Sequence, residues 1–309
     1  MTAALGDPRA QAPGSRPPTL TIGLPVYNGE EYLTQALDAL LAQTYTDFEL
    51  IISDNASTDR TAEICREYAE RDPRIRYVRQ PVNVGAGPNH NLLVPLARGK
   101  YFKWASHDDL YAPRLIELCV KELDEHPEVV LAHSWDAYID DRGEVVMEMD
   151  YPLDTANPDP AARLRSLLHV PGGNDFYGVM RTDMLRRVGE HHSYYNADRT
   201  FVAGLVLQGT FHQVPEVLYF RRDHPGRASR AGNRRDRAAA LDPRRRNRWR
   251  YPMAVMLMEY VLGFLGAIRK SPIGLRDKAR CLGEVGRWLF GFARPGRRVR
   301  SLEQDMDAT

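Results

Sequence analysis

Two adjacent carboxylates, Asp108 and Asp109, follow the apolar run at residues 101–105 and precede a helix-like stretch that starts at Pro113. Carboxylates at the end of a strand add little to stability, but they lie where open α/β sheets bind ligands. Their hard oxygen atoms suit Mg²⁺ or Mn²⁺ that is shared with phosphate groups. An isolated pair of aspartates is more often a solvated turn that caps the next helix. The surrounding sequence favours the ligand site.

The elements that would position these acids alternate between strands and helices. Apolar runs predict strands at residues 20–26, 48–53 and 75–78. A helical pattern follows each strand: the first at 33–41, the second ending at residue 70, and the third near 92–97. Asn28, with Glu31 three residues later, is expected to cap the first of these helices. This spacing predicts a parallel sheet with both faces covered. Polar clusters follow all three strands, so they should meet at the ligand-binding edge of the sheet.

Six short motifs occur in an order that resembles the family-2 glycosyltransferases. They are LPVYN at residues 24–28, DNASTD at 54–59, NVG at 83–85, Asn91, GKY at 99–101 and the acid pair at 108–109. Each motif is weak alone, but the ordered set is specific. The resemblance extends past residue 220 and covers roughly two thirds of the chain. It implies a GT-A fold, which is an α/β, Rossmann-like, mainly parallel sheet flanked by helices, here followed by a C-terminal helical appendage.

The same resemblance implies that the chain binds a nucleoside-diphosphate sugar, and it assigns contacts to particular residues. Pro25, Tyr27 and Asn28 would line the base, and Asp54 would hydrogen-bond the base or the ribose. The other residues expected at the nucleotide sugar are Asn83, Gly85, Asn91, Asp108 and Gly173. His90 stands where the family often has Arg, which weakens the expected positive charge opposite the diphosphate.

The resemblance also implies a divalent metal ion, Mg²⁺ or Mn²⁺, held by Asp108, Asp109 and His224. Ser106 stands where the first Asp of this motif usually stands. A single coordinating carboxylate is adequate when the diphosphate supplies more oxygens and water completes the shell. Arg222, two residues before His224, would neutralise phosphate charge or remain a solvated surface residue.

The resemblance places the catalytic base at Asp198, which opens a helical stretch that runs to Leu207. Taken alone, an Asp at the start of a helix is more often a cap. The glycine-rich stretch at residues 171–178 would either approach a sugar closely or form an ordinary turn. If Asp198 is not the base, the alternatives are Asp175, Glu190 and Asp223.

These expectations predict an inverting glycosyltransferase that moves a sugar to an acceptor hydroxyl on a sugar, a lipid-linked sugar or a small molecule. The setting would be polysaccharide, glycolipid or natural-product glycosylation. A non-catalytic sugar-nucleotide-binding or membrane-docking protein of the same fold is one alternative, supported by Ser106 and Ala197. A sugar-1-phosphate nucleotidyltransferase is another. It would need a glycine-rich basic loop near the N-terminus to hold a triphosphate, and residues 24–28 do not provide one.

Composition is that of an intracellular enzyme, and we expect a cytoplasmic location. The three cysteines, Cys65, Cys119 and Cys281, lack metal or redox spacing, and their odd number argues against a disulfide framework. The net charge of +1 hides a basic stretch at residues 221–250, with twelve Arg against three Asp. Aromatic residues hardly interleave with these arginines, with Trp249 as the exception, so we expect no nucleic acid as a partner.

The chain divides into five predicted segments. They are a disordered leader at 1–18 that is not a signal peptide, a GT-A domain at 19–228, a basic linker at 229–247, a helical appendage at 248–293 and a flexible tail at 294–309. The GT-A domain divides further into a nucleotide-sugar half at 19–110 and an acceptor half at 111–228.

The appendage contains an apolar stretch at residues 252–268 that is too short for a bilayer span and includes Glu259. A basic, amphipathic helix is predicted at about 275–292. Such helices suit anionic membrane surfaces, which would place the protein peripherally at the inner face of the membrane. The alternative is that the two helices close the acceptor side or pair subunits.

Overall fold

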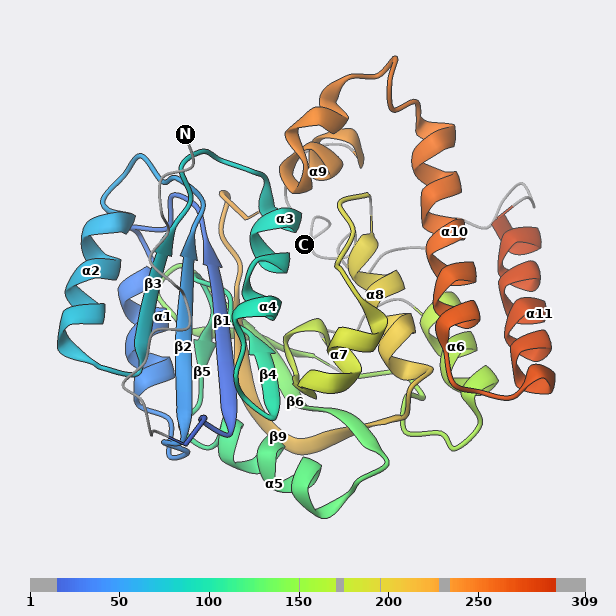
Figure 1. Ribbon diagram of the computed structural model, residues 1–309, viewed down its shortest axis with the longest axis horizontal. Coiled ribbons are helices and arrows are strands. Elements are labelled where there is room, and N and C mark those ends of the chain that lie inside the picture. The colour runs from blue at the N-terminus through green and yellow to red at the C-terminus, as the bar shows by residue number, and fades with distance from the viewer. Residues whose placement is uncertain (1–15, 150, 171–174, 195, 228–233, 293–309) are drawn as a thin grey trace.

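The computed structural model describes residues 16–149, 151–170, 175–194, 196–227 and 234–292. One nine-stranded sheet forms its centre, with the order β3-β2-β1-β4-β8-β6-β9-β5 and with β7 paired to β6 (Figure 1). The strands are β1 (Leu20–Val26), β2 (Phe48–Asp54), β3 (Ile75–Arg79), β4 (Tyr101–Trp104), β5 (Leu110–Tyr111), β6 (Val129–Ile139), β7 (Val145–Met149), β8 (Val179–Arg181) and β9 (Thr210–Arg222).

Helices connect and cover these strands. They are α1 (Leu33–Leu41), α2 (Thr61–Arg71), α3 (Ala86–Asn91), α4 (Leu93–Leu96), α5 (Leu115–Glu125), α6 (Pro160–His169), α7 (Thr182–Val188), α8 (Ala197–Val206), α9 (Arg234–Leu241), α10 (Met253–Lys270) and α11 (Leu275–Phe292), with short 3₁₀ turns η1 (Asp175–Tyr177) and η3 (Pro243–Arg246). The predicted α/β sheet with flanking helices and a C-terminal helical region is confirmed.

The first half of the sheet is parallel. β1 pairs in parallel with β2 and β4, and β2 pairs with β3, so the carboxyl ends of these strands share one edge. Every residue of β1 and β2 is buried, as expected of strands covered on both faces. The second half is mixed, because β8 runs antiparallel to β4 and β6 while β6 and β9 form a long parallel pair.

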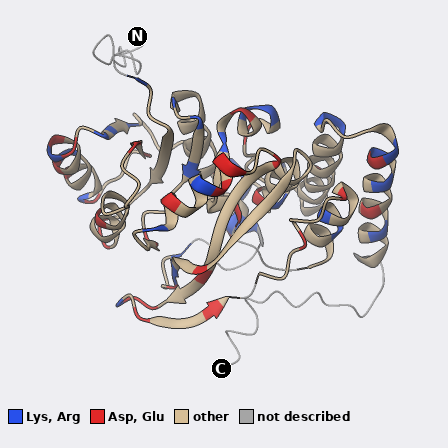
Figure 2. Cartoon of the chain, turned by 90° about the horizontal axis from the view of Figure 1, so that it is seen from below, with Lys and Arg blue, Asp and Glu red and all other residues tan. Residues whose placement is uncertain are grey.

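Two apolar cores lie on opposite faces of the sheet. One packs α1, α2 and α5 against the strands, and it contains Leu37, Cys65 and Cys119. The other joins Trp104 and Phe102 of β4 to α6, α8, α10 and α11. The strands of the sheet are mostly tan in Figure 2, whereas the charged residues gather on helices and loops. The core therefore depends on apolar burial across both sheet faces.

The C-terminal helices pack on the second half of the sheet domain, on the side of α6 and α8. Tyr260 and Phe264 of α10 are buried at the contact with α8, and α11 lies against α6 and α10. Part of the expected basic linker is helical, because α9 and η3 lie within it. Within the described ranges, no helix has both the length and the apolar character needed to cross a bilayer.

Gly99 marks the tightest backbone approach between β1 and the turn that leads into β4. A Cβ there would lie 2.5 Å from the backbone N of Thr21 and 2.7 Å from the backbone O of Tyr101. Both neighbours belong to paired strands, so neither can move aside cheaply. The Gly99 amide also donates to Thr21 Oγ1 at 2.9 Å, and Thr21 in turn donates to the buried Glu49.

We expect Gly99→Ala to lower the free energy of unfolding by about 1–3 kcal/mol, because the added methyl group overpacks fixed backbone. Gly266→Ala in α10 is the matched control. Its Cβ would meet nothing within 4 Å, and alanine favours a helix over glycine by about 0.5–1 kcal/mol. Denaturant unfolding measures both variants. A Gly99→Ala protein as stable as the wild type would contradict this packing.

Candidate active site

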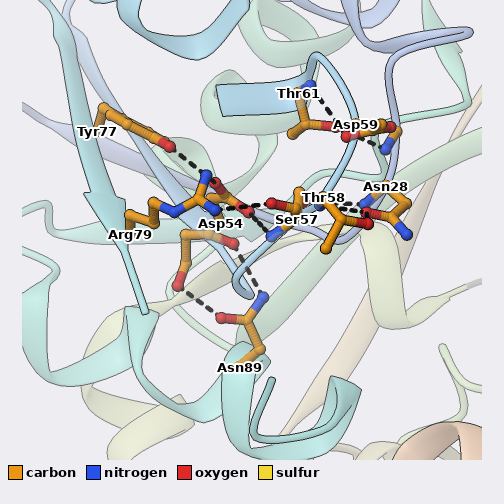
Figure 3. Close-up of polar contacts among 11 residues, drawn as sticks. Asn28, Asp54, Ser57, Thr58, Asp59, Thr61, Tyr77, Arg79 and Asn89 are labelled. Atoms are coloured by element: carbon orange, nitrogen blue, oxygen red, sulfur yellow. Dashed lines mark hydrogen bonds and ion pairs between the residues drawn. The ribbon is translucent and has the colours of Figure 1, made fainter. Parts of the chain in front are cut away.

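The loops that follow β1 and β2 are joined by a set of reciprocal hydrogen bonds (Figure 3). The Asn28 backbone N–H donates to Ser57 Oγ at 2.9 Å, and the Thr58 backbone N–H donates to Asn28 Oδ1 at 2.8 Å. Asn28 adopts a left-handed conformation with φ of 50°, which turns the chain toward the second loop. The predicted helix cap at Asn28 is therefore wrong. Helix α1 begins at Leu33 without a side-chain cap, since the Asn28 side chain binds a tertiary partner.

Asp54 lies at the carboxyl end of β2 and is fully buried. Its Oδ1 accepts from the Ser57 backbone N–H at 2.8 Å, and its Oδ2 accepts from the Tyr77 hydroxyl at 2.7 Å and from Arg79 at 2.9 Å (Figure 3). Burial, together with the hydrogen bond to Asp54, raises the pKa of Tyr77 to about 12, so the hydroxyl remains a donor near neutral pH. The protein itself thus satisfies both Asp54 oxygens.

Arg79 and Tyr77 are site residues that the sequence reasoning missed. The Arg79 side chain is 42% exposed while it holds Asp54, and it also donates to the Ser57 carbonyl at 2.7 Å. It therefore presents a cation at the edge where the loops meet. The available signal was positional: Arg79 ends the third strand, next to the polar clusters that follow the first two.

The loop after β3 joins the same edge. Asn55 donates to Asn83 Oδ1 at 3.0 Å, and the Gly85 backbone N–H donates to the same oxygen at 2.9 Å. Gly85 has a φ of 92°, and a Cβ there would lie 2.7 Å from the Leu241 carbonyl oxygen, so the end of α9 abuts this loop. The structure thus brings together the polar clusters that follow three strands.

Other predicted nucleotide residues lie in different settings. Pro25 is buried in β1, paired with Ser53 of β2, whereas Tyr27 is 43% exposed just beyond the strand. Asn91 forms two hydrogen bonds with the backbone of His191. Its Oδ1 accepts from the His191 N–H at 2.8 Å, and its Nδ2 donates to the His191 carbonyl oxygen at 2.7 Å. These bonds link two segments that are far apart in the sequence. Gly173 lies outside the described residues.

His90 lies in a cluster of aromatic side chains. Its ring centroid is 6.0 Å from Phe176 and 6.3 Å from Trp104, and these two rings stack on each other at 4.6 Å. Burial lowers the pKa of His90 to about 4. The ring is therefore neutral near pH 7 and cannot replace the charge of an arginine.

Asp108 is held in a charged form at the end of β4. Its Oδ2 lies 3.0 Å from His224 Nε2, and its Oδ1 accepts from the Ser106 hydroxyl. Burial alone would raise the pKa of Asp108, but the hydrogen bonds from His224 and Ser106 and the nearby charge of His107 outweigh it. The pKa therefore lies well below its usual range. A carboxylate and an imidazole that face each other form a pair of donor atoms suited to a divalent cation.

Asp109 points away from Asp108 and toward β9. Its Oδ1 accepts from the Arg222 backbone N–H at 2.9 Å, and its Oδ2 accepts from the Tyr219 hydroxyl. Burial and the neighbouring charge of Asp108 raise the pKa of Asp109. The three predicted metal ligands are thus divided into the pair Asp108–His224 and a separate Asp109. In the described part of the chain, no group of three or more His, Cys, Asp or Glu side chains is arranged around one metal position.

Arg222 is fully buried, so neither predicted role, phosphate neutralisation or surface solvation, fits its position. Its guanidinium donates to the carbonyl oxygens of Asp108, Asp140 and Asp141 at 3.0, 3.0 and 2.9 Å, and to Gln35 Oε1 of α1 at 2.8 Å. It also lies 4.6 Å from the centroid of the Tyr32 ring. One side chain therefore joins the Asp108 loop, the turn after β6 and α1.

Asp198 lies in the first turn of α8, as predicted, and its side chain is exposed. Although it reaches solvent, the surrounding protein displaces enough water to raise the pKa of its carboxyl, and Arg199 counteracts part of this rise. No described side chain donates a hydrogen bond to this carboxylate. An accessible carboxylate with a raised pKa suits proton abstraction from a hydroxyl.

Asp175, one of the alternative bases, lies in the 3₁₀ turn η1, and the charge of Arg199 acts on its carboxyl as it does on that of Asp198. Asp175 is buried, and its Oδ1 has no hydrogen-bond partner within the described ranges. Burial raises the pKa of Asp175 to about 6. It is less accessible to an acceptor than Asp198.

Part of the sequence matches known proteins. The sequence profile described as "Glycosyl transferase family 2" matches residues 21–189. The chain is 32% identical over 133 residues to an uncharacterized glycosyltransferase of Methanocaldococcus jannaschii, covering 42% of this chain and 46% of that protein. It is 34% identical over 131 residues to the chondroitin synthase of Escherichia coli, covering 42% of this chain and 19% of that protein. It thus spans less than half the length of these curated relatives.

Solved structures share the fold. TarS residues 1–349 of S. aureus, in complex with UDP-GlcNAc, superposes with a TM-score of 0.68 at 18% identity, covering 93% of this chain and 77% of that one. The mannosyltransferase PcManGT of Pyrobaculum calidifontis, in complex with GDP-Man and Mn2+, gives a TM-score of 0.53 at 19% identity, covering 89% and 81%. These likenesses show that the fold is of the GT-A type.

Arg222→Lys should lower the melting temperature and weaken the response to Mn²⁺. A lysine ammonium cannot reach the Asp108 carbonyl, the turn after β6 and Gln35 together, and each buried acceptor left unpaired costs about 1–3 kcal/mol. Thermal unfolding with and without Mn²⁺ measures both effects.

Arg114→Lys is the control for this substitution. Arg114 forms an exposed pair with Glu216, so its replacement should change stability by no more than about 0.5 kcal/mol. Equal melting temperatures for the two variants would show that the Arg222 contacts do not hold the Asp108 loop.

Proposed function

Because the chain belongs to glycosyltransferase family 2, we propose that it is a metal-dependent, inverting enzyme that moves a sugar from a nucleoside-diphosphate sugar to an acceptor hydroxyl. The observation that supports this most directly is the pairing of Asp108 with His224 at the end of β4, beside the loops that follow β1 and β2. Polysaccharide, glycolipid or natural-product glycosylation remains the setting that we propose.

The donor, in this proposal, binds across the loops that follow β1, β2 and β3. Tyr27 and Arg79 are exposed there and would contact the base and the ribose. Asp54 and Asn28 would act indirectly, because their side-chain oxygens accept hydrogen bonds from Arg79 and from the Thr58 backbone and so hold these residues in place. Related folds bind UDP-GlcNAc and GDP-Man, which makes both donors reasonable first probes.

Five further residues complete the proposed donor site. Asn83 and Gly85 would shape the loop beside the base, and Pro25 would support Tyr27 from within β1. Gly173 would approach the donor sugar, as its motif implies. For Asn91 we propose a positioning role, because its amide is engaged by the His191 backbone.

Asp108 and His224 would hold Mg²⁺ or Mn²⁺, and the fit of this group to the chain is good on two counts. The Asp108 carboxylate is kept ionised, and its Oδ2 lies 3.0 Å from His224 Nε2, a separation that two ligands of one ion can have once the hydrogen-bond proton between them is lost. A divalent cation bound there would neutralise negative charge on the leaving diphosphate. Asp109 would contribute indirectly, because it fixes the loop to β9 through Tyr219 and Arg222.

Asp198 would act as the base. Its carboxylate accepts the proton of the acceptor hydroxyl as that oxygen bonds to the anomeric carbon and the bond from this carbon to the diphosphate breaks. Attack on the face opposite the leaving group inverts the anomeric configuration. The first turn of α8 favours a negative charge, while the protein around Asp198 raises its pKa toward the range of an effective base.

The acceptor would enter over α8 on the side of the C-terminal helices. We also propose that the enzyme works peripherally at a membrane surface through those helices, which exposes the acceptor half to lipid-linked acceptors. A non-catalytic donor-binding protein is the alternative to this function. It would bind the same nucleotides without turning them over.

The first test measures hydrolysis and transfer of UDP-GlcNAc and GDP-Man with Mn²⁺, with Mg²⁺ and with EDTA. We expect turnover that EDTA abolishes, and we expect Asp108→Ala to lower it by about 10²-fold or more, since charge stabilisation of the leaving group is lost. Asp124→Ala is the control, because Asp124 is an exposed residue paired with Lys100. Near-normal turnover by Asp108→Ala in EDTA would refute the metal assignment, and donor binding without turnover would favour the alternative.

Asp198→Asn should lower kcat by about 10²–10⁴-fold and leave donor binding by calorimetry unchanged. In the wild type, the acidic limb of the kcat profile should lie above the usual aspartate pKa of about 3.9, because the base must lose a proton whose pKa is raised.

Asp183→Asn makes the same substitution in the first turn of α7 and should retain full activity. If Asp198 were only a helix cap, Asn would replace it without loss. An Asp198→Asn protein with more than about a tenth of the wild-type kcat would direct the search for the base to Asp175, Glu190 or Asp223.

A further inference from the structure

Helix α10 is apolar on both its inner and its outer face. The inner face, with Met256, Tyr260 and Phe264, is buried against the acceptor half and α11. The outer positions Met258 and Leu262, one turn apart, are 53% and 54% exposed. Leu257 and Met253 are also exposed, at 50% and 42%. A surface helix normally presents polar side chains on its outer face. The exposed apolar side chains of α10 therefore indicate a surface that contacts another molecule or a membrane.

The segment just before α10 exposes aromatic and cationic side chains. Trp249 is 85% exposed, and the guanidinium of Arg248 lies 5.5 Å from the centroid of its ring. Arg246 and Arg250 are exposed as well. In the described part of the chain, none of these three arginines forms an ion pair, whereas the adjacent Arg244 and Arg245 pair with Asp242 and Glu259. The three charges are therefore available to an external anion.

These arginines also surround a concave surface. Residues 243–251 enclose an open hollow of about 920 Å³ that is lined by Arg244, Arg246, Arg248 and Arg250 together with Trp249. Pro252 then leads directly into α10 (Figure 1). The segment that lines the hollow is therefore followed in the chain by the helix that carries the apolar stripe. Beside α10, helix α11 exposes Leu289 and Phe290, at 37% and 79%.

The charges decide which partner fits this surface best. A second copy of the chain across a two-fold axis would bring the same unpaired arginines close to each other, which repel. An anionic bilayer offers phosphate groups to the arginines, an interfacial region to Trp249, and acyl chains to the stripe on α10. Arginine binds phosphate through two parallel N–H donors, which suits a headgroup better than a diffuse charge.

We propose that residues 246–262 form a docking surface for an anionic lipid bilayer. Arg246, Arg248 and Arg250 bind headgroup phosphates, while Trp249, Met258 and Leu262 enter the interfacial region. Because the inner face of α10 packs on α8, whose first turn carries Asp198, docking holds the acceptor half at a fixed distance from the lipid surface. This inference rests on the membrane part of the proposed function and is independent of the transfer chemistry.

The test is flotation of the full chain with vesicles of phosphatidylcholine alone and with equimolar phosphatidylcholine and phosphatidylglycerol. We expect flotation with the anionic vesicles only, and a decrease as salt rises. Each arginine at such a surface contributes about fivefold in affinity, so Arg248→Glu/Arg250→Glu should weaken binding by about 25-fold or more. Arg66→Glu/Arg71→Glu, which makes the same charge change on exposed positions of α2, should float like the wild type.

A second variant, Met258→Ser/Leu262→Ser, tests the apolar stripe without a change in charge. It should also lose flotation, and since both positions are exposed, its melting temperature should stay at the wild-type value. A wild-type protein that remains in the soluble fraction at low salt would overturn the inference, as would flotation that neither variant weakens.

Analytical ultracentrifugation supplies a competing outcome. A concentration-dependent dimer that Met258→Ser/Leu262→Ser abolishes, without flotation of the wild type, would assign this face to contact between copies. Flotation is measured without donor or acceptor. An inactive protein that floats would therefore refute the proposed transfer alone, and an active protein that does not float would refute the docking surface alone.

Discussion

The buried guanidinium of Arg222 is the interaction on which the candidate site depends. It comes from the end of β9, and it binds the Asp108 carbonyl, the turn after β6 and Gln35 of α1. A buried arginine is costly unless its donors are satisfied, and here the protein satisfies them with backbone and amide oxygens from three segments. The orientation of Asp108 toward His224 follows from this, because the loop between β4 and β5 has little regular structure of its own.

The same principle holds at the edge of the sheet where the loops after β1, β2 and β3 meet, because polar residues there support one another. Asp54 is occupied by Tyr77 and Arg79, and Asn28 by the loop that contains Thr58. Such second-layer contacts orient the side chains that remain exposed, and a pre-organised site gains affinity because less has to be ordered on binding. Arg79 is thereby positioned by a carboxylate that would otherwise repel a diphosphate.

The two faces of helix α10 differ in their burial. The inner face of α10 completes the apolar core that it shares with α6, α8 and α11. Its outer face, with Met258 and Leu262, is left for a partner. The inner face thus packs on the protein, and for the outer face we propose the lipid bilayer. The sequence of α10 is apolar on all sides, which fits neither a membrane span of this length nor an ordinary surface helix. We explain this by the packed inner face together with an outer face that, in our proposal, contacts lipid.

The sequence alone determined the alternating strands and helices, the edge at which polar clusters gather, the acid pair after the fourth strand and the first-turn position of Asp198. These features are local, since periodicity and strand ends can be read within a few residues. Only the tertiary structure decided the partners. Asp108 and Asp109 are adjacent, yet they face His224 and Tyr219. Those partners lie 110 or more residues away, and only the pairing of β9 with β5 and β6 brings them to the acids.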